Sequence, residues 1–175
     1  MNFFGIITQN LQKEVVALEK IRANEEDLLL LEMLQTDCRK SLKEIAKKAG
    51  MPMSTVHEKI KRFEKTGLIK SYRALLDEKK LGFDVTAFIM ASTEYLGGDK
   101  NFQRKLGEKV ASLPNVLGVH TVSGDWDLII KVKFKGVQQL GKFVNESVRT
   151  IPGIDKTMTM VSIDEIKEDT ILTLG

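Results

Sequence analysis

The sequence predicts an α+β protein with an N-terminal winged helix-turn-helix domain and a C-terminal ferredoxin-like βαββαβ domain. Three observations support this fold class. Two short helices meet at a glycine turn near residue 50, two copies of a strand–helix–strand unit occupy residues 85–164, and positive charge is concentrated in the first half of the chain. Because each of these units closes its own core, we expect two separately packed domains.

The length and composition fit a protein of a reducing compartment. The chain has 175 residues, of which 42% are hydrophobic, enough for one large domain or two small ones. Its single cysteine, Cys38, excludes an internal disulfide framework and is expected to be inert. The longest apolar run, near Leu28, is shorter than the roughly 20 residues of a membrane span, and the N-terminus lacks a signal-peptide pattern. We therefore expect a cytoplasmic location.

The first helices are marked by their caps. Asn24 precedes three acidic residues, as expected at the positive end of a helix dipole, and an apolar run follows. The sequence "SLKE" is a capping box, in which Ser41 and Glu44 satisfy each other's backbone N–H groups. This second helix ends at Gly50, because glycine favours the left-handed position after a helix. A third helix follows and ends before Gly67.

The second and third helices form a helix-turn-helix pattern. Ala46, Gly50 and Val56 provide a close approach, a turn and a core anchor in the expected order. Because Val56, Ile60 and Phe63 fix the buried face of the third helix, its other face points outward. The outward residues, with His57 at the margin, are Ser54, Thr55, His57, Glu58, Lys61, Arg62 and Lys65. Hydrogen-bonding groups near the start and cations beyond it suit a helix that reads DNA in the major groove.

The positive charge lies in the same segment. The whole chain has a net charge of +3, but residues 38–73 hold eleven Lys and Arg against three Glu. Residues 76–175 hold thirteen basic and fourteen acidic residues. A phosphate-facing module joined to a nearly neutral domain would have this distribution, so double-stranded DNA is the expected partner. A solvated lysine-rich face is the alternative interpretation.

The residues after the third helix set the domain limits. The stretch 68–76 alternates apolar and polar residues and is predicted to be a strand that serves as a wing or hinge. The polar stretch 77–84 is predicted to be a linker. We expect a helical N-terminal extension over 1–24, a helix-turn-helix DNA-binding domain with its hinge strand over 25–76, the linker over 77–84 and the ferredoxin-like domain over 85–175.

Residues 85–164 contain one structural unit twice. Each copy has a strand, an amphipathic helix and a second strand, and the helices end in the matching sequences "LPNV" and "IPGI", whose prolines are Pro114 and Pro152. The expected strands span 85–95, 115–123, 126–134 and 153–163, and the expected helices span 101–113 and 137–151. Two such units joined by a tight turn predict a sheet with both helices on one face.

The opposite face of this sheet has no helix to cover it. It still carries apolar residues, because both phases of the strands "VTAFIMA" and "LIIKV" are largely hydrophobic. Packing against the sheet of a second copy would bury this face. The sequence therefore predicts an obligate homodimer.

The sequence "SGDWD" joins the two copies at residues 123–127. A hairpin turn needs only the glycine, so a structural turn is one interpretation. A ligand site is the other, with backbone N–H groups near Gly124 holding a carboxylate, Asp125 or Asp127 pairing with an ammonium group, and Trp126 forming a wall. A free amino acid carries both of these charges.

Sequence patterns of catalysis are absent. The chain has no P-loop, dinucleotide fingerprint or metal-ligand spacing. His57 and His120 belong to different predicted domains, and one cysteine cannot form a Cys/His cluster within a chain. We expect no cofactor, no metal site and no enzymatic activity, with His57 facing DNA and His120 on a strand.

Over residues 25 to about 172 the chain resembles the Lrp/AsnC, or feast/famine, transcriptional regulators. The resemblance is carried by the helix-turn-helix "SLKEIAKKAGMPMSTVHEKIKRFEKTGLI", the hinge "IKSYRALLDEKKLG", the loop "VSGDWDLII" and the "LPNV" and "IPGI" repeat. It implies a DNA-binding regulator that forms homodimers and higher oligomers, binds pseudo-palindromic DNA and senses a small effector, commonly an amino acid, through a C-terminal RAM domain used for effector binding and oligomerisation.

The resemblance also implies candidate sites. The helix from Met53 to Lys65 would be the recognition helix and would contact DNA through the outward residues given above. The effector site, lying between dimers, would include Gly124, Asp125, Trp126 and Asp127, completed by Thr157 and Thr159 of a neighbouring subunit.

Three features depart from the family pattern. Pro52 stands in place of a serine cap, Ser71 replaces a glycine in the hinge, and the first 24 residues are additional. Within this extension Phe4, Ile7, Leu11, Leu18 and Ile21 recur at heptad-like spacing. This spacing predicts a helix that packs on a partner subunit or on its own first domain.

Two other functions are compatible with the sequence. A DNA-packaging protein would coat DNA without an effector, through phosphate contacts alone. A sirohaem decarboxylase-like enzyme would share both domains. It would need basic and histidine residues in the second domain, where the only histidine is His120. Such an enzyme would also have no use for the positive charge of residues 38–73.

Overall fold

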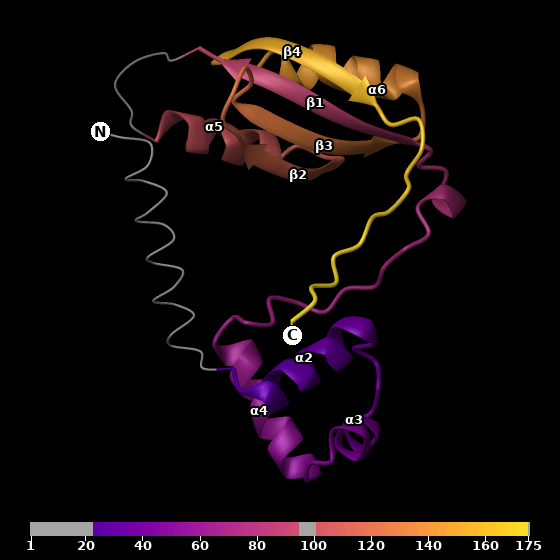
Figure 1. Cartoon of the computed structure of the whole chain (residues 1–175). Helices are drawn as coiled ribbons and strands as arrows, with labels where there is room; N and C mark the ends of the chain where they lie inside the picture. The colour runs from indigo at the N-terminus through magenta and orange to yellow at the C-terminus, as the bar shows by residue number, and fades with distance from the viewer. Residues whose placement is uncertain (1–22, 95–100, 175) are drawn as a thin grey trace. The chain divides into compact units, whose positions relative to one another are not determined.

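The chain forms two compact units in a computed structural model that describes residues 23–94 and 101–174 (Figure 1). The first unit contains the described residues up to Ala74 together with those from Asp169 onward, and the second spans Leu75–Glu168. The predicted α+β class is confirmed, with helices in the first unit and a sheet with helices in the second. Apart from Ala23 and Asn24, the predicted extension lies outside the described residues.

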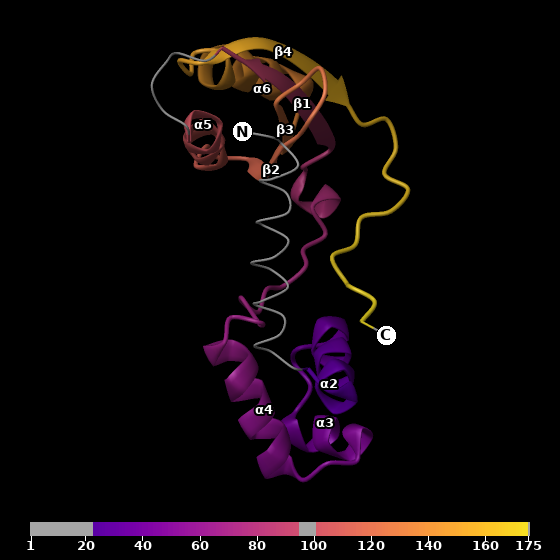
Figure 2. The same ribbon diagram turned by 60° about the vertical axis from the view of Figure 1, so that its left-hand side comes forward.

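Three helices make up the first unit, and they lie together in the turned view (Figure 2). They are α2 (Glu25–Thr36), α3 (Leu42–Ala49) and α4 (Met53–Lys65). The capping box of α3 is confirmed, because the Ser41 side chain accepts from the Glu44 N–H and the Glu44 carboxylate accepts from the Ser41 N–H. Gly50 ends α3 with φ +66°, the left-handed conformation that favours glycine.

The core of the first unit is small. Its buried apolar residues are Leu30, Leu34, Ile45, Ala46, Val56 and Phe63. The turn after α3 is closed by the Met51 N–H, which donates to the Ala46 carbonyl at 3.1 Å. Ala46 therefore lies both in the core and beside the turn, as the helix-turn-helix pattern predicts. None of the helices in the described part of the chain has both the length and the apolar character to cross a bilayer.

The stretch 68–76 does not form the predicted strand. Leu68 and Ile69 pack against the helical core, whereas Leu75 is almost fully exposed. A strand needs a neighbour that shares its backbone hydrogen bonds, and no described segment of this chain pairs with the stretch. Alternation of apolar and polar residues was therefore insufficient to make a strand in the single chain.

Residues from Asp169 onward pack with the first unit, although they were predicted as part of a domain over 85–175. The Gln35 side chain donates to the Leu172 carbonyl at 3.1 Å and accepts from the Leu172 N–H at 2.9 Å. The Leu174 N–H donates to the Glu32 carboxylate at 3.4 Å. This segment borders an apolar groove of about 660 Å³ between α2 and the residues that follow α4.

The second unit is a four-stranded antiparallel sheet in the order β2-β3-β1-β4. Its elements are β1 (Val85–Thr93), α5 (Phe102–Ala111), β2 (Val116–Thr121), β3 (Leu128–Phe134), α6 (Val137–Phe143) and β4 (Ile154–Val161). This order is that of the predicted ferredoxin-like fold. The helix predicted over 137–151 is α-helical only in its first part and continues as a π-helical segment, Val144–Val148.

The two faces of the sheet differ. Residues facing the helices, such as Ile89 and Ile130, are fully buried with apolar residues of α5 and α6. On the other face Phe88 lies opposite Met160, and both side chains are exposed. Lys133 is also on that face but is buried, and its ammonium pairs with Glu78 and, at 3.6 Å, with Glu165. These partners lie in the segments that precede β1 and follow β4.

Candidate nucleic-acid interface and effector loop

Helix α4 has a buried face and an exposed face. Val56 and Phe63 are fully buried in the helical core. The exposed side chains among the predicted DNA-contacting residues are Ser54, His57, Glu58, Lys61, Arg62 and Lys65, whereas Thr55 is half-buried. Pro52 precedes the helix and provides no side-chain cap. One surface thus gathers hydroxyl, imidazole and carboxylate groups with ammonium groups further along the helix.

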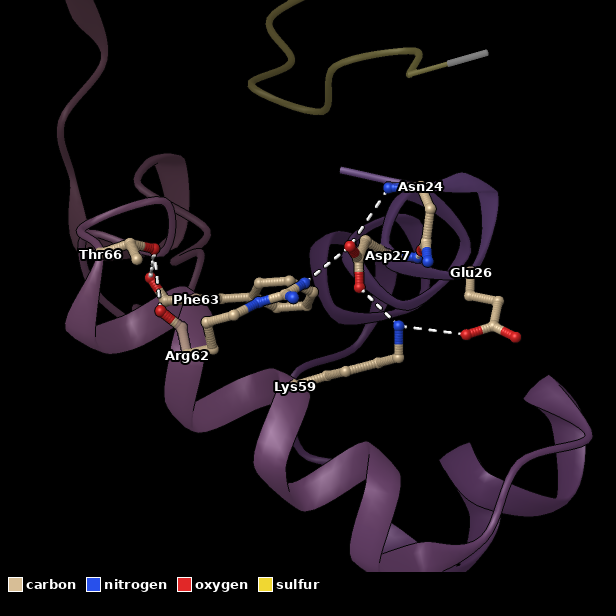
Figure 3. A network of polar contacts seen from close by, with 7 residues as sticks. All are labelled: Asn24, Glu26, Asp27, Lys59, Arg62, Phe63 and Thr66. Carbon is tan, nitrogen blue, oxygen red and sulfur yellow. Dashed lines mark hydrogen bonds and ion pairs between the residues drawn. The ribbon is translucent and has the colours of Figure 1, made fainter. Parts of the chain in front are cut away.

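Arg62 also has a partner inside the protein (Figure 3). Its Nη2 lies 2.6 Å from Oδ2 of Asp27, a residue of α2 whose side chain is 1% exposed. Lys59 Nζ lies 2.8 Å from the other oxygen, Oδ1, and 3.1 Å from the Glu26 carboxylate. The backbone N–H of Asn24 also donates to Asp27 Oδ2, at 3.2 Å. Three donors thus converge on one buried carboxylate between α2 and α4.

The surroundings of Asp27 keep it ionised. Burial opposes the charged form, but hydrogen bonds from Lys59, the Asn24 backbone and Arg62 outweigh this effect and hold the pKa of Asp27 below its ordinary value. The same carboxylate raises the pKa of Lys59. Desolvating such ions is costly, so removing one partner of a buried pair destabilises a protein by about 3–5 kcal/mol. The network therefore holds α2 and α4 together only while both signs are present.

Asp27 and Lys59 were not among the predicted site residues. Two signals were available. Lys59 follows Val56 by three residues and precedes Phe63 by four, which places a cation beside the buried stripe of α4. Asp27 follows the cap Asn24 by three residues, the position of the acidic partner in a capping box, and both hydrogen bonds of that box are present. Local sequence patterns could not show that the two residues contact each other, because they are 32 positions apart.

The loop between β2 and β3 is fixed by one of its two carboxylates. Asp127 accepts from the Thr93 N–H at 2.7 Å, from the Thr93 hydroxyl at 2.9 Å and from the Gln103 side chain at 2.9 Å. It thereby ties the loop to the end of β1 and to α5. Gly124 has φ +130°, a conformation that other residues rarely adopt. Thr93 and Gln103 were not predicted to contribute to this loop.

The other predicted effector residues are more open. Asp125 is exposed and Trp126 is half-buried. Thr157 is half-buried and Thr159 is exposed, both on β4. Ala91 of β1 pairs with Leu128 of β3 on one side and with Thr157 on the other. Within one chain the loop and Thr157 therefore lie at the same end of the sheet, two strand spacings or about 10 Å apart.

Both units match known protein families. Residues 86–172 match the Lrp/AsnC ligand binding domain, and residues 24–70 match the winged helix-turn-helix DNA-binding family. An uncharacterized HTH-type transcriptional regulator of Pyrococcus abyssi is 37% identical over 143 residues, which cover 82% of this chain and 94% of that protein. HTH-type transcriptional regulator FL11 of Pyrococcus furiosus is 32% identical over 146 residues, covering 83% of this chain and 93% of FL11.

Solved structures share the fold. AsnC of E. coli superposes with a TM-score of 0.75 at 25% identity, covering 85% of this chain and 97% of AsnC. A transcriptional regulator of Neisseria meningitidis, solved as a complex with L-Met, gives a TM-score of 0.78 at 23% identity, covering 86% of this chain and 96% of that one.

Proposed function

Because the chain belongs to the Lrp/AsnC family of transcriptional regulators, we propose that α4 binds a specific DNA sequence and that a small molecule held near residues 124–127 modulates this binding. The exposed face of α4 is the observation that carries the first part. Ser54 lies near the helix start, where base edges are reached, and Lys61 and Lys65 lie further along, where phosphates are neutralised. Thr55, His57 and Glu58 complete the proposed base-reading set.

The proposed effector is an amino acid. Asp127 is already engaged by Thr93 and Gln103, so the exposed Asp125 is the group that would pair with an ammonium. Backbone N–H groups near Gly124 would receive the carboxylate, and Trp126 would contact the side chain. Thr157 and Thr159 would come from a neighbouring subunit. L-methionine is the first ligand to test, since the Neisseria protein was solved with it.

The proposed assembly is a homodimer that can associate further. Phe88, Met158 and Met160 on the open sheet face are 36%, 41% and 44% exposed, and Phe88 of β1 lies opposite Met160 of β4, two residues from Met158. Burying these side chains against the same face of a second copy would remove apolar surface from water. We further propose that the protein acts in the cytoplasm by binding alone, without catalysis or a cofactor.

DNA selection from a random duplex pool tests the first part. We expect enrichment of a pseudo-palindromic sequence. Lys65→Ala should weaken binding to all duplexes equally and reduce the slope of log affinity against log salt by about 0.9, because one phosphate contact is lost. Ser54→Ala should instead change which sequence is enriched. Binding without enrichment would favour a DNA-packaging protein and contradict the proposal.

Titration of the DNA complex with each of the twenty amino acids, beginning with L-methionine, tests the second part. One amino acid should shift the DNA affinity, and Asp125→Ala should abolish that shift while leaving DNA binding in the absence of the effector unchanged. Asp84→Ala, which removes an exposed carboxylate of the same unit away from the loop, is the matched control. A response that survives Asp125→Ala would place the effector elsewhere.

A further inference from the structure

Asp27 holds two cations that lie on the flank of α4 (Figure 3). With about 100° between successive residues of a helix, Arg62 lies about 80° around α4 from Ser54, and Lys59 lies about 40° from the buried Phe63. Both cations are therefore turned toward α2 and away from the outward direction of Ser54. Lys59 is only 14% exposed on its side chain, whereas the Arg62 side chain is 50% exposed.

The two contacts constrain the rotation of α4 about its own axis. Lys59 and Arg62 are three residues apart, about 4.5 Å along the helix, and both end on the same carboxylate. That carboxylate is itself fixed to the start of α2 by the Asn24 N–H. Charge-assisted hydrogen bonds are directional, whereas the apolar contacts of Val56 and Phe63 are not. The apolar stripe of Val56 and Phe63 gives α4 its buried face, and the polar contacts fix the rotation of the helix within the range that this stripe allows.

The same contacts neutralise two cations within the protein. Cations that reach phosphates bind every DNA sequence and make binding salt-dependent. Sequence discrimination comes from groups that reach base edges in a fixed geometry. A carboxylate that pairs two cations of α4 and also fixes the rotation of that helix favours discrimination over general affinity.

We propose that Asp27 is a positioning residue that determines DNA specificity: it fixes the rotation of α4 and withholds Lys59 and Arg62 from the phosphate backbone. This inference rests on the proposed function, in which α4 contacts DNA. Asp27 itself does not touch DNA. Arg62, which was predicted to contact DNA, acts in this arrangement through α2.

Comparison of Arg62→Gln with Lys61→Gln tests the inference. The two variants remove one positive charge each from adjacent positions, one paired with Asp27 and one facing outward. The affinity of the full chain is measured against salt for the selected duplex and for a scrambled duplex of equal composition. Lys61→Gln should reduce the salt slope by about 0.9. Arg62→Gln should leave the slope unchanged and lower the ratio of specific to non-specific affinity by about tenfold, the loss expected for one base contact.

Asp27→Asn provides a second readout. It should free the half-exposed Arg62, steepen the salt slope by about 0.9 and lower the specificity ratio by about tenfold. A purely structural role would reduce both affinities in parallel without changing the slope, and this would overturn the inference. Thermal unfolding establishes whether Asp27→Asn folds. If it does not fold, the comparison of Arg62→Gln with Lys61→Gln tests the inference without it.

The outcomes separate the inference from the proposed function. If the unaltered protein does not prefer the selected duplex to the scrambled one, the proposed function fails and the inference fails with it. If it does, but Arg62→Gln and Lys61→Gln reduce the salt slope equally, the proposed function stands and the inference is overturned.

Discussion

Each unit of the protein buries one charged side chain among its described residues, and the two charges are opposite in sign. In the first unit Asp27 is 1% exposed and is held by Lys59 and Arg62. In the second unit Lys133 is 9% exposed and is held by Glu78 and Glu165. Asp27, in the first turn of α2, joins α2 to α4 beside a small apolar core. Lys133 joins the segments that lead into and out of a sheet whose core is apolar.

The contribution of a buried ion to stability should depend on the size of the apolar core beside it. Six buried apolar residues form the core of the described part of the first unit, so its polar contacts should contribute a larger share of its stability. The described part of the second unit has fourteen, and Lys133 is not among the residues of this apolar core. The partners of Lys133 are also more open, at 40% and 35% exposure of their side chains. Polar substitutions should therefore weaken the first unit more than the second.

The largest expected effect is that of Asp27→Ala. It should lower the free energy of unfolding of the first unit by about 2 kcal/mol, because the charge-assisted hydrogen bonds to Asp27 are lost, while Lys59 keeps Glu26 at 3.1 Å and Arg62 is half exposed. Hydrogen exchange of the amides of α2 and α4 measures this loss. Fluorescence of Trp126, the single tryptophan of the chain, reports the second unit and should not change. A loss below about 1 kcal/mol would mean that water replaces the carboxylate at little cost.

Lys133→Met should have a smaller effect. Methionine keeps most of the packing of the lysine stem, and pairs with partly exposed carboxylates contribute at most about 1 kcal/mol. We expect a loss of this size in the second unit, measured by denaturant unfolding followed through Trp126. A loss as large as that of Asp27→Ala would remove the distinction between the two units.

The contribution of Asp27 to the stability of the first unit should be lost gradually as the pH falls. The pKa of Asp27 is lowered from 3.8 in the folded chain, so its stabilisation is complete above that value and is lost as the pH falls through the lower folded value. The slope that one such group can add is at most about 1.4 kcal/mol per pH unit. Exchange of α2 and α4 amides between pH 5 and pH 2 should show a weaker pH dependence in Asp27→Asn than in the unaltered chain. Equal slopes in both would contradict the role of this carboxylate.

Local signals in the sequence predicted the fold well. The capping box of Ser41 and Glu44, the turn at Gly50 and the limits of α4 all depend on residues within a few positions, and the structure confirms them. The strand order of the second unit follows from the repeat and from the handedness of the connections. The stretch 68–76 was predicted wrongly because a strand depends on a partner that local alternation does not reveal.

The candidate sites were harder to predict, because their contacts join distant residues. The spacing of residues along α4 predicted that Lys61 and Arg62 both face outward and contact DNA. In the structure Arg62 pairs with Asp27, which lies 35 positions earlier in the chain. In the loop, Asp125 and Asp127 are two positions apart and have the same side chain. Only the contacts with Thr93 and Gln103 distinguish the carboxylate that holds the loop from the one that is open.

The place of residues 169–174 in the first unit affects the order in which the protein can be completed on the ribosome. Their contacts with Gln35 and Glu32 belong to the helix-turn-helix unit, yet they are translated after the whole of Leu75–Glu168. At about 5–20 residues per second, translation of that segment takes roughly 5–20 s. During this interval α2, α3 and α4 lack the hydrogen bonds that Gln35 and Glu32 make with residues 172 and 174. The unit translated first is therefore the last to receive all of its contacts.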